Sequence, residues 1–303
     1  MQNITDAIIA KASEVILGKE HQIKLALACI LARGHLLIED LPGMGKTTLA
    51  HTLAQVLGLQ FQRVQFTSDL LPADILGVSV YDRNAANFKF HPGPAFTNVL
   101  LADEINRATP KTQSALLEVM EEAQVTIDAV TYQLPQPFFV IATQNPSSQI
   151  GTFALPESQL DRFLMRISLD YPDAASERQL LKNNGGREQL ANIHPVIDSQ
   201  QLQMLQTACK SIHVSEPLLD YLQIILKYTR QSTNFAAGLS PRAGLSLKQC
   251  AQAWAMIAGR DHVIPEDIQA ILPSVAGHRL VSNSGTESSA HNIANLLKTI
   301  AIP

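Results

Sequence analysis

Cysteine is scarce in this sequence, and the few thiols are far apart. The 303 residues include Cys29, Cys209 and Cys250, and no two of them form a C-x-x-C pair. An odd number of widely spaced cysteines argues against a disulfide framework and against a zinc site built on cysteine pairs. We therefore expect three small, packed side chains in a reducing compartment.

Charge is also limited, and neither sign dominates. Charged residues make up 17% of the chain and the net charge is −4, whereas hydrophobic residues make up 46%. This composition is typical of a folded protein with a full core, of one large or two smaller domains. It lacks the basic excess of a dedicated nucleic-acid binder, which argues against nucleic acid as a main partner.

Long apolar runs are absent. The run LALACILA at 25–32 is far shorter than the ~20 residues that a membrane helix needs. The first residues, MQNITDAIIAKASEVILG, do not combine a basic start with a long apolar stretch, as a signal peptide would. We expect a cytoplasmic protein with no membrane span.

Short apolar runs of strand length recur through the first half of the chain, with helix-like segments at 47–57 and 109–122 between them. The runs are HLLIE (35–39), FQRVQF (61–66), NVLLA (98–102), FFVIA (138–142) and RISLD (166–170). Nearly continuous apolar strands are typical of a parallel sheet that is buried on both faces. The alternation of strands and helices predicts an α/β fold with such a sheet.

The remainder of the chain divides at polar segments. Residues 67–94 are too long for a simple loop and predict a small insertion. Residues 124–135 predict a hairpin with Asp128 and Ala129 at its turn. After 171–173 the pattern becomes helical, interrupted by polar stretches at 182–189 and 282–289. The helical segments are 201–211, 216–231, 242–258 and 265–272. The predicted domains are a core at 1–172, a linker at 173–199 and an all-helical domain at 200–303.

The segment EDLPGMGKTT (39–48) resembles a phosphate-binding loop but departs from the strict G-x-x-x-x-G-K-[ST] pattern, because Asp40 stands where the first glycine is expected. It follows a predicted strand and precedes a predicted helix, as such a loop must. Gly43 and Gly45 let the backbone N–H groups face a phosphate at a helix N-terminus. Lys46 would contact the β- and γ-phosphates, and the Thr47 hydroxyl could bind Mg²⁺. We expect the Asp40 carboxylate to point away from the phosphates.

Two acidic residues follow the third predicted strand. Asp103 at the strand tip would hold Mg²⁺ through water, and Glu104 would polarise an attacking water molecule. The next strand ends near Asn145, whose amide could align that water or contact the γ-phosphate. Outside the context of a phosphate loop, an Asn-Pro turn would explain Asn145 equally well.

Two arginines are further candidates. Arg162 could reach into a neighbouring subunit's site as an arginine finger, or it could form a surface salt bridge with Asp161. Arg242, in LSPRA, could contact the phosphates from the helical domain, although an isolated arginine is usually only exposed.

Together these motifs resemble the MoxR family of AAA+ ATPases over nearly the whole chain. The resemblance is densest in GHLLIEDLPGMGKTTLA, FTSDLLPADILG, FHPGPAF, LLADEINRATPKTQSALLEVMEE, FFVIATQNP and GTFALPESQLDRFL. It implies an AAA+ P-loop core with a five-stranded parallel sheet between helices, followed by a small all-helical lid. The family's own loop commonly carries an acidic residue at the position of Asp40.

The resemblance also implies roles for individual residues. Asn145 matches sensor 1, Arg162 the arginine finger and Arg242 sensor 2, which makes them catalytic together with Glu104. Thr47 and Asp103 match the magnesium ligands. The matching nucleotide-binding residues are Ile16, Leu17 and Gly18 beside the adenine, and Pro42, Gly43, Met44, Gly45, Lys46, Thr47 and Thr48 around the phosphates.

The function that the resemblance implies is ATP hydrolysis with Mg²⁺ in a homo-oligomeric, hexameric ring. Such a ring would act as a chaperone-like remodeller in the maturation of a protein complex or metalloenzyme, beside a von Willebrand factor A domain protein and an unknown client. The alternative is a nucleotide-gated binding switch with little turnover, against which the carboxylate of Glu104 argues. A guanine-specific N-K-x-D motif is absent, which disfavours a GTPase.

Overall fold

The structure is a computed structural model, and it describes residues 2–84, 86–146, 151–182, 190, 192–283 and 289–300. The predicted polar breaks at 182–189 and 282–289 lie largely outside these residues. Within the described part, no helix has the length and apolarity to cross a bilayer.

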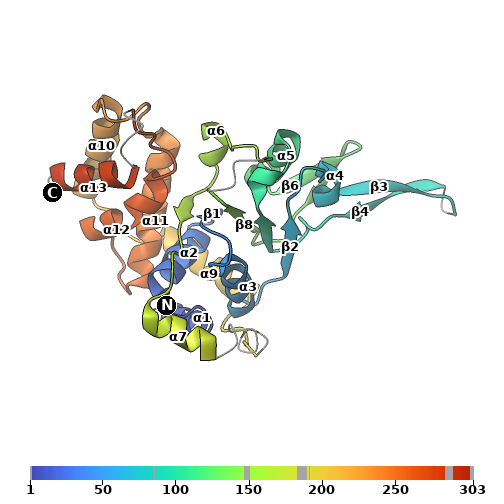
Figure 1. Ribbon diagram of the computed structural model, residues 1–303, viewed down its shortest axis with the longest axis horizontal. Helices are drawn as coiled ribbons and strands as arrows, with labels where there is room; N and C mark the ends of the chain where they lie inside the picture. Colours follow the sequence, from blue (N-terminus) through green and yellow to red (C-terminus); the bar gives the residue numbers. More distant parts are fainter. Residues whose placement is uncertain are drawn as a thin grey trace.

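A five-stranded parallel sheet forms the centre of the N-terminal part, which confirms the predicted fold class (Figure 1). Its strand order is β2-β5-β8-β1-β9. The strands are β1 (Leu36–Glu39), β2 (Phe61–Gln65), β5 (Val99–Asp103), β8 (Phe139–Gln144) and β9 (Met165–Ile167). Because all five run in one direction, their carboxyl ends meet at one edge of the sheet, where ligands of open α/β sheets bind.

The last strand is shorter than predicted. The sequence predicts a strand at 166–170, but β9 ends at Ile167. Beyond it, the backbone N–H groups of Leu169 and Asp170 bond to the Asp40 carboxylate instead of a neighbouring strand, and Asp170 has a φ of 54°. A left-handed residue cannot continue a strand, so the chain turns away.

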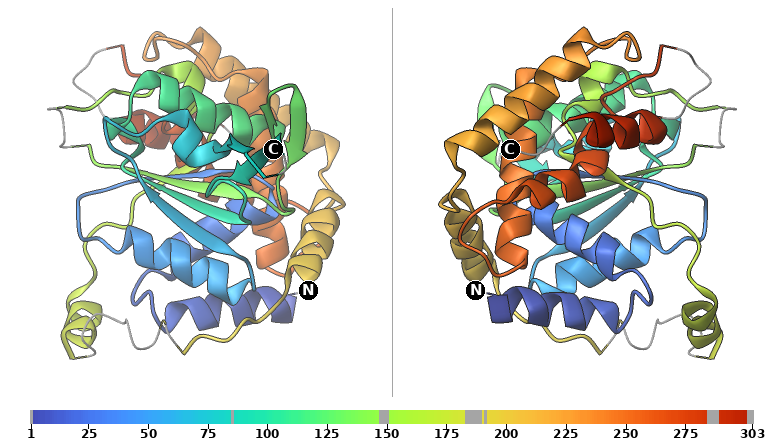
Figure 2. Two further views of the ribbon diagram at one scale, coloured as in Figure 1. Left: turned by 90° about the vertical axis from the view of Figure 1, so that its right-hand side faces the viewer. Right: turned by 90° about the vertical axis from the view of Figure 1, so that its left-hand side faces the viewer.

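Helices cover both faces of the sheet (Figure 2). On one face lie α1 (Gln2–Ser13), α2 (Glu20–Leu31) and α3 (Lys46–Val56). On the other face α5 (Pro110–Glu122) packs over residues such as Leu100 and Val140. The short helix η1 (Ile105–Arg107) follows β5, and the short helix α6 (Glu157–Leu160) precedes β9.

Two hairpins extend from the second face. The segment 67–94 contains α4 (Pro72–Leu76) and an antiparallel pair, β3 (Gly77–Asp82) and β4 (Asn87–Pro92), which projects far from the body (Figure 1). Strands β6 (Gln124–Ile127) and β7 (Val130–Gln133) form a second hairpin. Its turn residues Asp128 and Ala129 both have positive φ, as a two-residue hairpin turn of matching twist requires.

The C-terminal part is helical, in helices α9 (Ser199–Lys210), α10 (Glu216–Gln231), α11 (Pro241–Ile257), α12 (Pro265–Ala276) and α13 (Ser289–Thr299). A further helix, α7 (Ala174–Lys182), falls in the predicted linker. Helix α11 packs against α2, and α12 packs against β9. One continuous hydrophobic cluster therefore runs from α1–α3 into the helical part.

Candidate nucleotide site

The loop between β1 and α3 forms an open cradle at the carboxyl edge of the sheet. Gly43 and Gly45 have φ angles of 83° and 88°, which side chains rarely adopt. A Cβ added at either glycine would meet nothing within 4 Å, so both face open space. The loop ends at Lys46, the first residue of α3, so the N-terminus of that helix points toward the same space.

Asp40 explains why the loop tolerates an acidic residue at its first position. The side chain is buried, and its Oδ2 accepts hydrogen bonds from the backbone N–H groups of Leu169 at 2.7 Å and Asp170 at 2.8 Å. Its Oδ1 accepts from the N–H of Leu41 at 2.8 Å. The carboxylate thus holds the turn after β9 and points away from the cradle, which confirms the expectation.

The Lys46 ammonium lies between the ends of β1 and β8. Its Nζ donates to the carbonyl oxygens of Asp40 at 2.5 Å and Gln144 at 3.5 Å. Burial lowers the pKa of Lys46, and the nearby carboxylates of Asp40, Asp103 and Glu104 oppose that effect. A phosphate would supply the charged partner that this half-buried cation lacks in the backbone carbonyls.

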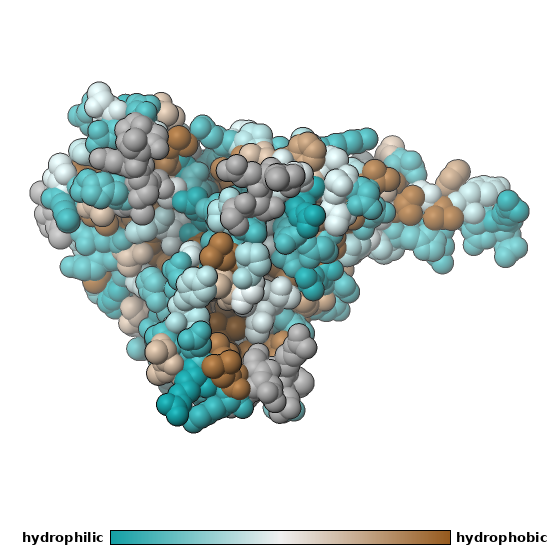
Figure 3. Space-filling model, viewed as in Figure 1, coloured by the Kyte–Doolittle hydropathy of each residue, from teal (hydrophilic) through white to brown (hydrophobic). Residues whose placement is uncertain are grey.

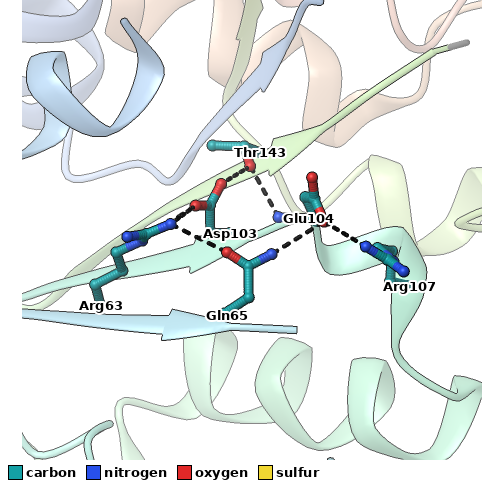
Figure 4. A network of polar contacts seen from close by, with 6 residues as sticks. All are labelled: Arg63, Gln65, Asp103, Glu104, Arg107 and Thr143. Atoms are coloured by element: carbon teal, nitrogen blue, oxygen red, sulfur yellow. Dashed lines mark hydrogen bonds and ion pairs between the residues drawn. The ribbon is translucent and has the colours of Figure 1, made fainter. Parts of the chain in front are cut away.

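Asp103 and Glu104 lie at the end of β5 and are held by β8 (Figure 4). The Thr143 hydroxyl donates to Asp103 Oδ1 at 2.6 Å and accepts from the backbone N–H of Glu104 at 2.9 Å. Glu104 has a φ of 57°, a left-handed conformation that is uncommon for a non-glycine residue. Such strain is typical of sites whose surroundings fix one orientation.

Two side chains of β2 reach the same carboxylates, and the sequence reasoning missed both. Arg63 donates to Asp103 Oδ2 from Nη2 at 2.7 Å and from Nε at 3.1 Å. Gln65 donates from Nε2 to Glu104 Oε2 at 3.0 Å, and Arg107 donates to the same oxygen at 3.2 Å. A signal was present, because Arg63 and Gln65 are polar residues at i and i+2 and so share one face of a strand.

These residues surround one cavity of about 330 Å³. Its lining is Pro42, Gly43, Gly45, Lys46, Thr47, Thr48, Arg63, Gln65, Asp103, Glu104 and Asn145. The predicted phosphate loop, the acidic pair and Asn145 therefore meet at one place. Met44 instead packs against the hydrophobic cluster.

Most of this chain is similar to proteins of a known family. Residues 35–165 match the family described as "ATPase family associated with various cellular activities (AAA)", and residues 227–296 match the AAA lid domain. The chain is 38% identical to the Chaperone MoxR1 of Mycobacterium tuberculosis, over 97% of this chain and 81% of that protein. The chain belongs to the MoxR family of AAA+ ATPases.

Further relatives agree with this assignment. The uncharacterized protein YeaC of Bacillus subtilis is 44% identical over 90% of this chain and 87% of its own length. A solved candidate ATPase of Cytophaga hutchinsonii has a TM-score of 0.92 and 36% identity, and covers all of this chain and 96% of its own. The α/β core and helical lid are thus shared with a solved protein that this chain matches over nearly its whole length.

The residues that line the cavity have the chemical groups needed to bind a nucleotide with Mg²⁺. The two glycines leave room for phosphate at a helix N-terminus, and the Lys46 ammonium faces it. Oxygen donors of Thr47 and Asp103 line the same space, and Mg²⁺ prefers oxygen ligands.

The predicted adenine segment lies apart from the cavity lining, beside the start of α7. Gly18 has a φ of 69°, and a Cβ there would come within 2.4 Å of Ser176 Oγ and 2.8 Å of Asp173 Oδ2. Ile16 is buried and Leu17 is half-buried. The positive φ and this close approach favour glycine at position 18, where the segment lies against the start of α7.

Arg162 and Arg242 do not line the cavity of their own chain. Both instead bind the carboxylate of Glu121 on α5: Arg162 Nη1 lies 2.6 Å from Oε2, and Arg242 bonds to Oε1. The Arg242 hydrogen bond, more than any other cause, lowers the pKa of Glu121. The alternative partner considered for Arg162 was wrong, because Asp161 pairs with Arg279. Within this chain, Arg242 is placed away from the phosphate loop.

Proposed function

We propose that this MoxR protein hydrolyses ATP at a site completed by a second subunit, and that it uses the cycle to remodel a protein client. The observation that carries the proposal is that the two arginines lie outside the cavity that holds the other predicted catalytic residues. The phosphate loop, Asp103 and Glu104 share one cavity, while Arg162 and Arg242 gather at Glu121 outside it. Two arginines on a separate face are suited to stabilise phosphate charge in a neighbouring protomer.

Each residue of the cavity has a role in the proposal. Lys46 and the loop N–H groups bind the phosphates, and Thr47 and Asp103 hold Mg²⁺, which neutralises charge on the β- and γ-oxygens. Glu104 accepts a proton from the attacking water, and Asn145 orients that water. Ile16, Leu17 and Gly18 border the adenine.

We place both arginines in trans. The sequence suggested that Arg242 contacts the phosphates from the helical domain, but Glu121 holds Arg242 beside Arg162. In a homo-oligomeric ring, which we take to be hexameric, the pair would face the neighbour's γ-phosphate together. An arginine finger contributes about 10³–10⁵ in rate where it has been measured in GTPases.

The projecting β3–β4 hairpin is our choice for client contact. It exposes Val78, Val80, Tyr81 and Phe88, and Phe88 is 69% exposed (Figure 3). Exposed apolar side chains on an isolated two-stranded ribbon suit transient protein contact. The name of MoxR1 as a chaperone supports this role. We take the client to be a complex or metalloenzyme in maturation, in the cytoplasm, with a von Willebrand factor A domain protein as partner.

A binding switch with little turnover is the second candidate. It is favoured by the two hydrogen bonds that Gln65 and Arg107 make to one oxygen of Glu104. These two donors occupy Oε2 and hold the carboxylate of Glu104 in one orientation until they move. Basal hydrolysis would then be slow without the partner or client.

The test is the ATPase rate per protomer against protein concentration, with Mg²⁺ and with native mass spectrometry on the same samples. A rate that rises cooperatively as oligomers form supports the shared site. A constant rate in a monomeric sample contradicts it. Nucleotide binding with no hydrolysis at any concentration favours the switch.

A further inference from the structure

Both oxygens of the Asp103 carboxylate already have partners. Oδ1 accepts the Thr143 hydroxyl at 2.6 Å, and Oδ2 accepts two N–H groups of Arg63 at 2.7 and 3.1 Å. The Asp103 side chain is only 11% exposed. A metal ion can therefore bind Oδ2 only where Arg63 leaves, whereas Oδ1 already accepts the hydroxyl group of Thr143.

The two partners differ in how easily they can leave. Thr143 is fully buried in β8, and its hydroxyl also accepts the N–H of Glu104. Arg63 is 49% exposed and stands on β2, with its guanidinium in the cavity beside the phosphate loop. Its long side chain can move into water at little cost, whereas a displaced Thr143 would leave buried polar groups unpaired.

Arg63 and a metal ion cannot bind Oδ2 together. The guanidinium makes a two-pronged, charge-assisted contact to that single oxygen, as Figure 4 shows. A metal ion that binds through one of its waters would still stand next to a positive charge, and the two cations repel each other.

We propose that Arg63 is the resident counter-cation of Asp103 in the nucleotide-free protein, and that the metal ion of the nucleotide must displace it. The inference rests on the proposed function for the place of the metal at Asp103. It adds a residue that sets the metal dependence of nucleotide binding. A released Arg63 keeps a nearby partner, because its Nη2 already donates to Gln65 Oε1 at 3.1 Å.

The test compares the affinity for a fluorescent ADP with Mg²⁺ and with EDTA, in the wild type and in Arg63→Gln. The readout is the ratio of the two dissociation constants, in which any effect of Arg63 on the nucleotide alone cancels. Because Arg63→Gln removes the competing cation, the ratio of the dissociation constant in EDTA to that in Mg²⁺ should rise about five- to tenfold. This is the range expected for a half-exposed charge-assisted contact. Arg63→Lys keeps a cation on β2 and should stay close to the wild type.

A double-mutant cycle shows where Arg63 acts. In the Asp103→Asn background the carboxylate charge is gone, so Arg63→Gln should no longer change the ratio. An unchanged ratio in Arg63→Gln alone would overturn the proposal. A lower ratio would also overturn it, because Arg63 would then help to hold the metal nucleotide.

The experiment is independent of hydrolysis, because ADP is not split. A protein that binds ADP with the expected ratios but never hydrolyses ATP would contradict the ATPase function and leave Arg63 as a competitor. If fluorescent ADP does not bind at all, Mn²⁺ titration of the nucleotide-free protein by EPR decides: Arg63→Gln must bind Mn²⁺ more tightly than the wild type, and equal affinity overturns the inference.

Discussion

The side chain of Arg279, in the lid, donates from Nε to Asp161 Oδ1 at 2.6 Å, one residue before Arg162. Arg279 is 5% exposed, and its Nη2 also donates to the backbone oxygens of Asp161 and Phe163 at 3.1 and 2.8 Å. The segment that carries the proposed arginine finger is therefore fixed from the lid.

Arg279→Met should destabilise the protein by about 2–4 kcal/mol, because it leaves a partly buried carboxylate and several carbonyl oxygens without their donor. Urea unfolding measures this change. The matched control is Arg178→Met on the exposed face of α7, which should stay within about 0.5 kcal/mol of the wild type. Equal stability of the two variants would contradict the clamp.

Lys46→Ala should weaken ATP binding by about 100-fold or more, since a charge-assisted contact to phosphate contributes up to about 3 kcal/mol. Isothermal titration calorimetry measures the affinity. Lys111→Ala, an exposed lysine on α5, is the control and should bind normally. Tight ATP binding by Lys46→Ala would exclude the phosphate-loop assignment.

Glu104→Gln should bind ATP but hydrolyse it about 10²–10⁴ times more slowly, because an amide cannot take a proton from water. Single-turnover hydrolysis and nucleotide binding are measured on the same preparation. Glu216→Gln, at an exposed site on α10, should retain wild-type turnover. Near-normal hydrolysis by Glu104→Gln would assign the base elsewhere.

Arg162→Ala and Arg242→Ala should each retain ATP binding and lose at least about 10²-fold in hydrolysis, at the low end for a charge-stabilising donor. Mixing either variant with Lys46→Ala should restore activity, because one subunit then supplies the intact phosphate loop and the other the intact arginine. Mass spectrometry must show mixed oligomers. Mixed oligomers without restored activity would argue against both trans roles.

His35 should make stability fall in mild acid. Burial lowers its pKa to about 4, and its ring bonds to the Met120 carbonyl and the Val140 N–H. The unfolded chain has a His pKa of about 6.5, so between pH 6.5 and 4 it binds more protons than the folded chain, and stability decreases as the pH falls.

The expected loss from His35 is about 2 kcal/mol between pH 7 and pH 5. His35→Gln can form both hydrogen bonds without a proton equilibrium and should reduce the pH slope of urea unfolding by that amount. His194→Asn, at an exposed position, is the control. An unaltered slope in His35→Gln would show that the buried ring does not contribute.

The sequence predicts those parts whose pattern is local. The apolar runs before Asp103 and Asn145 indicate buried strands, and glycines at 43 and 45 indicate the phosphate loop. Contacts that depend on the order of the strands in the sheet cannot be predicted from the sequence in this way. Arg63 reaches Asp103 because β2 pairs with β5, and Gln65 lies opposite Asp103 in that pairing. No short-range sequence pattern predicts which two strands pair.

Ion pairs between side chains that are distant in the sequence cannot be predicted for the same reason. Glu121 lies far in sequence from Arg162 and Arg242, and only the packed fold brings the three together. The sequence predicts a linker at 173–199, whereas the structure forms helix α7 there, and none of the residues of this helix is buried.

The shared hydrophobic cluster of α1–α3 and the lid limits how this molecule can move. A wide hinge between lid and core would separate α11 from α2 and α12 from β9 and bring their buried side chains into water. In the proposed ring, large displacements would therefore be less costly between subunits than between the lid and core of one chain. The lid and core of a single chain are thus expected to move as one rigid body. This body carries the nucleotide cavity in one place and the pair of Arg162 and Arg242 in another.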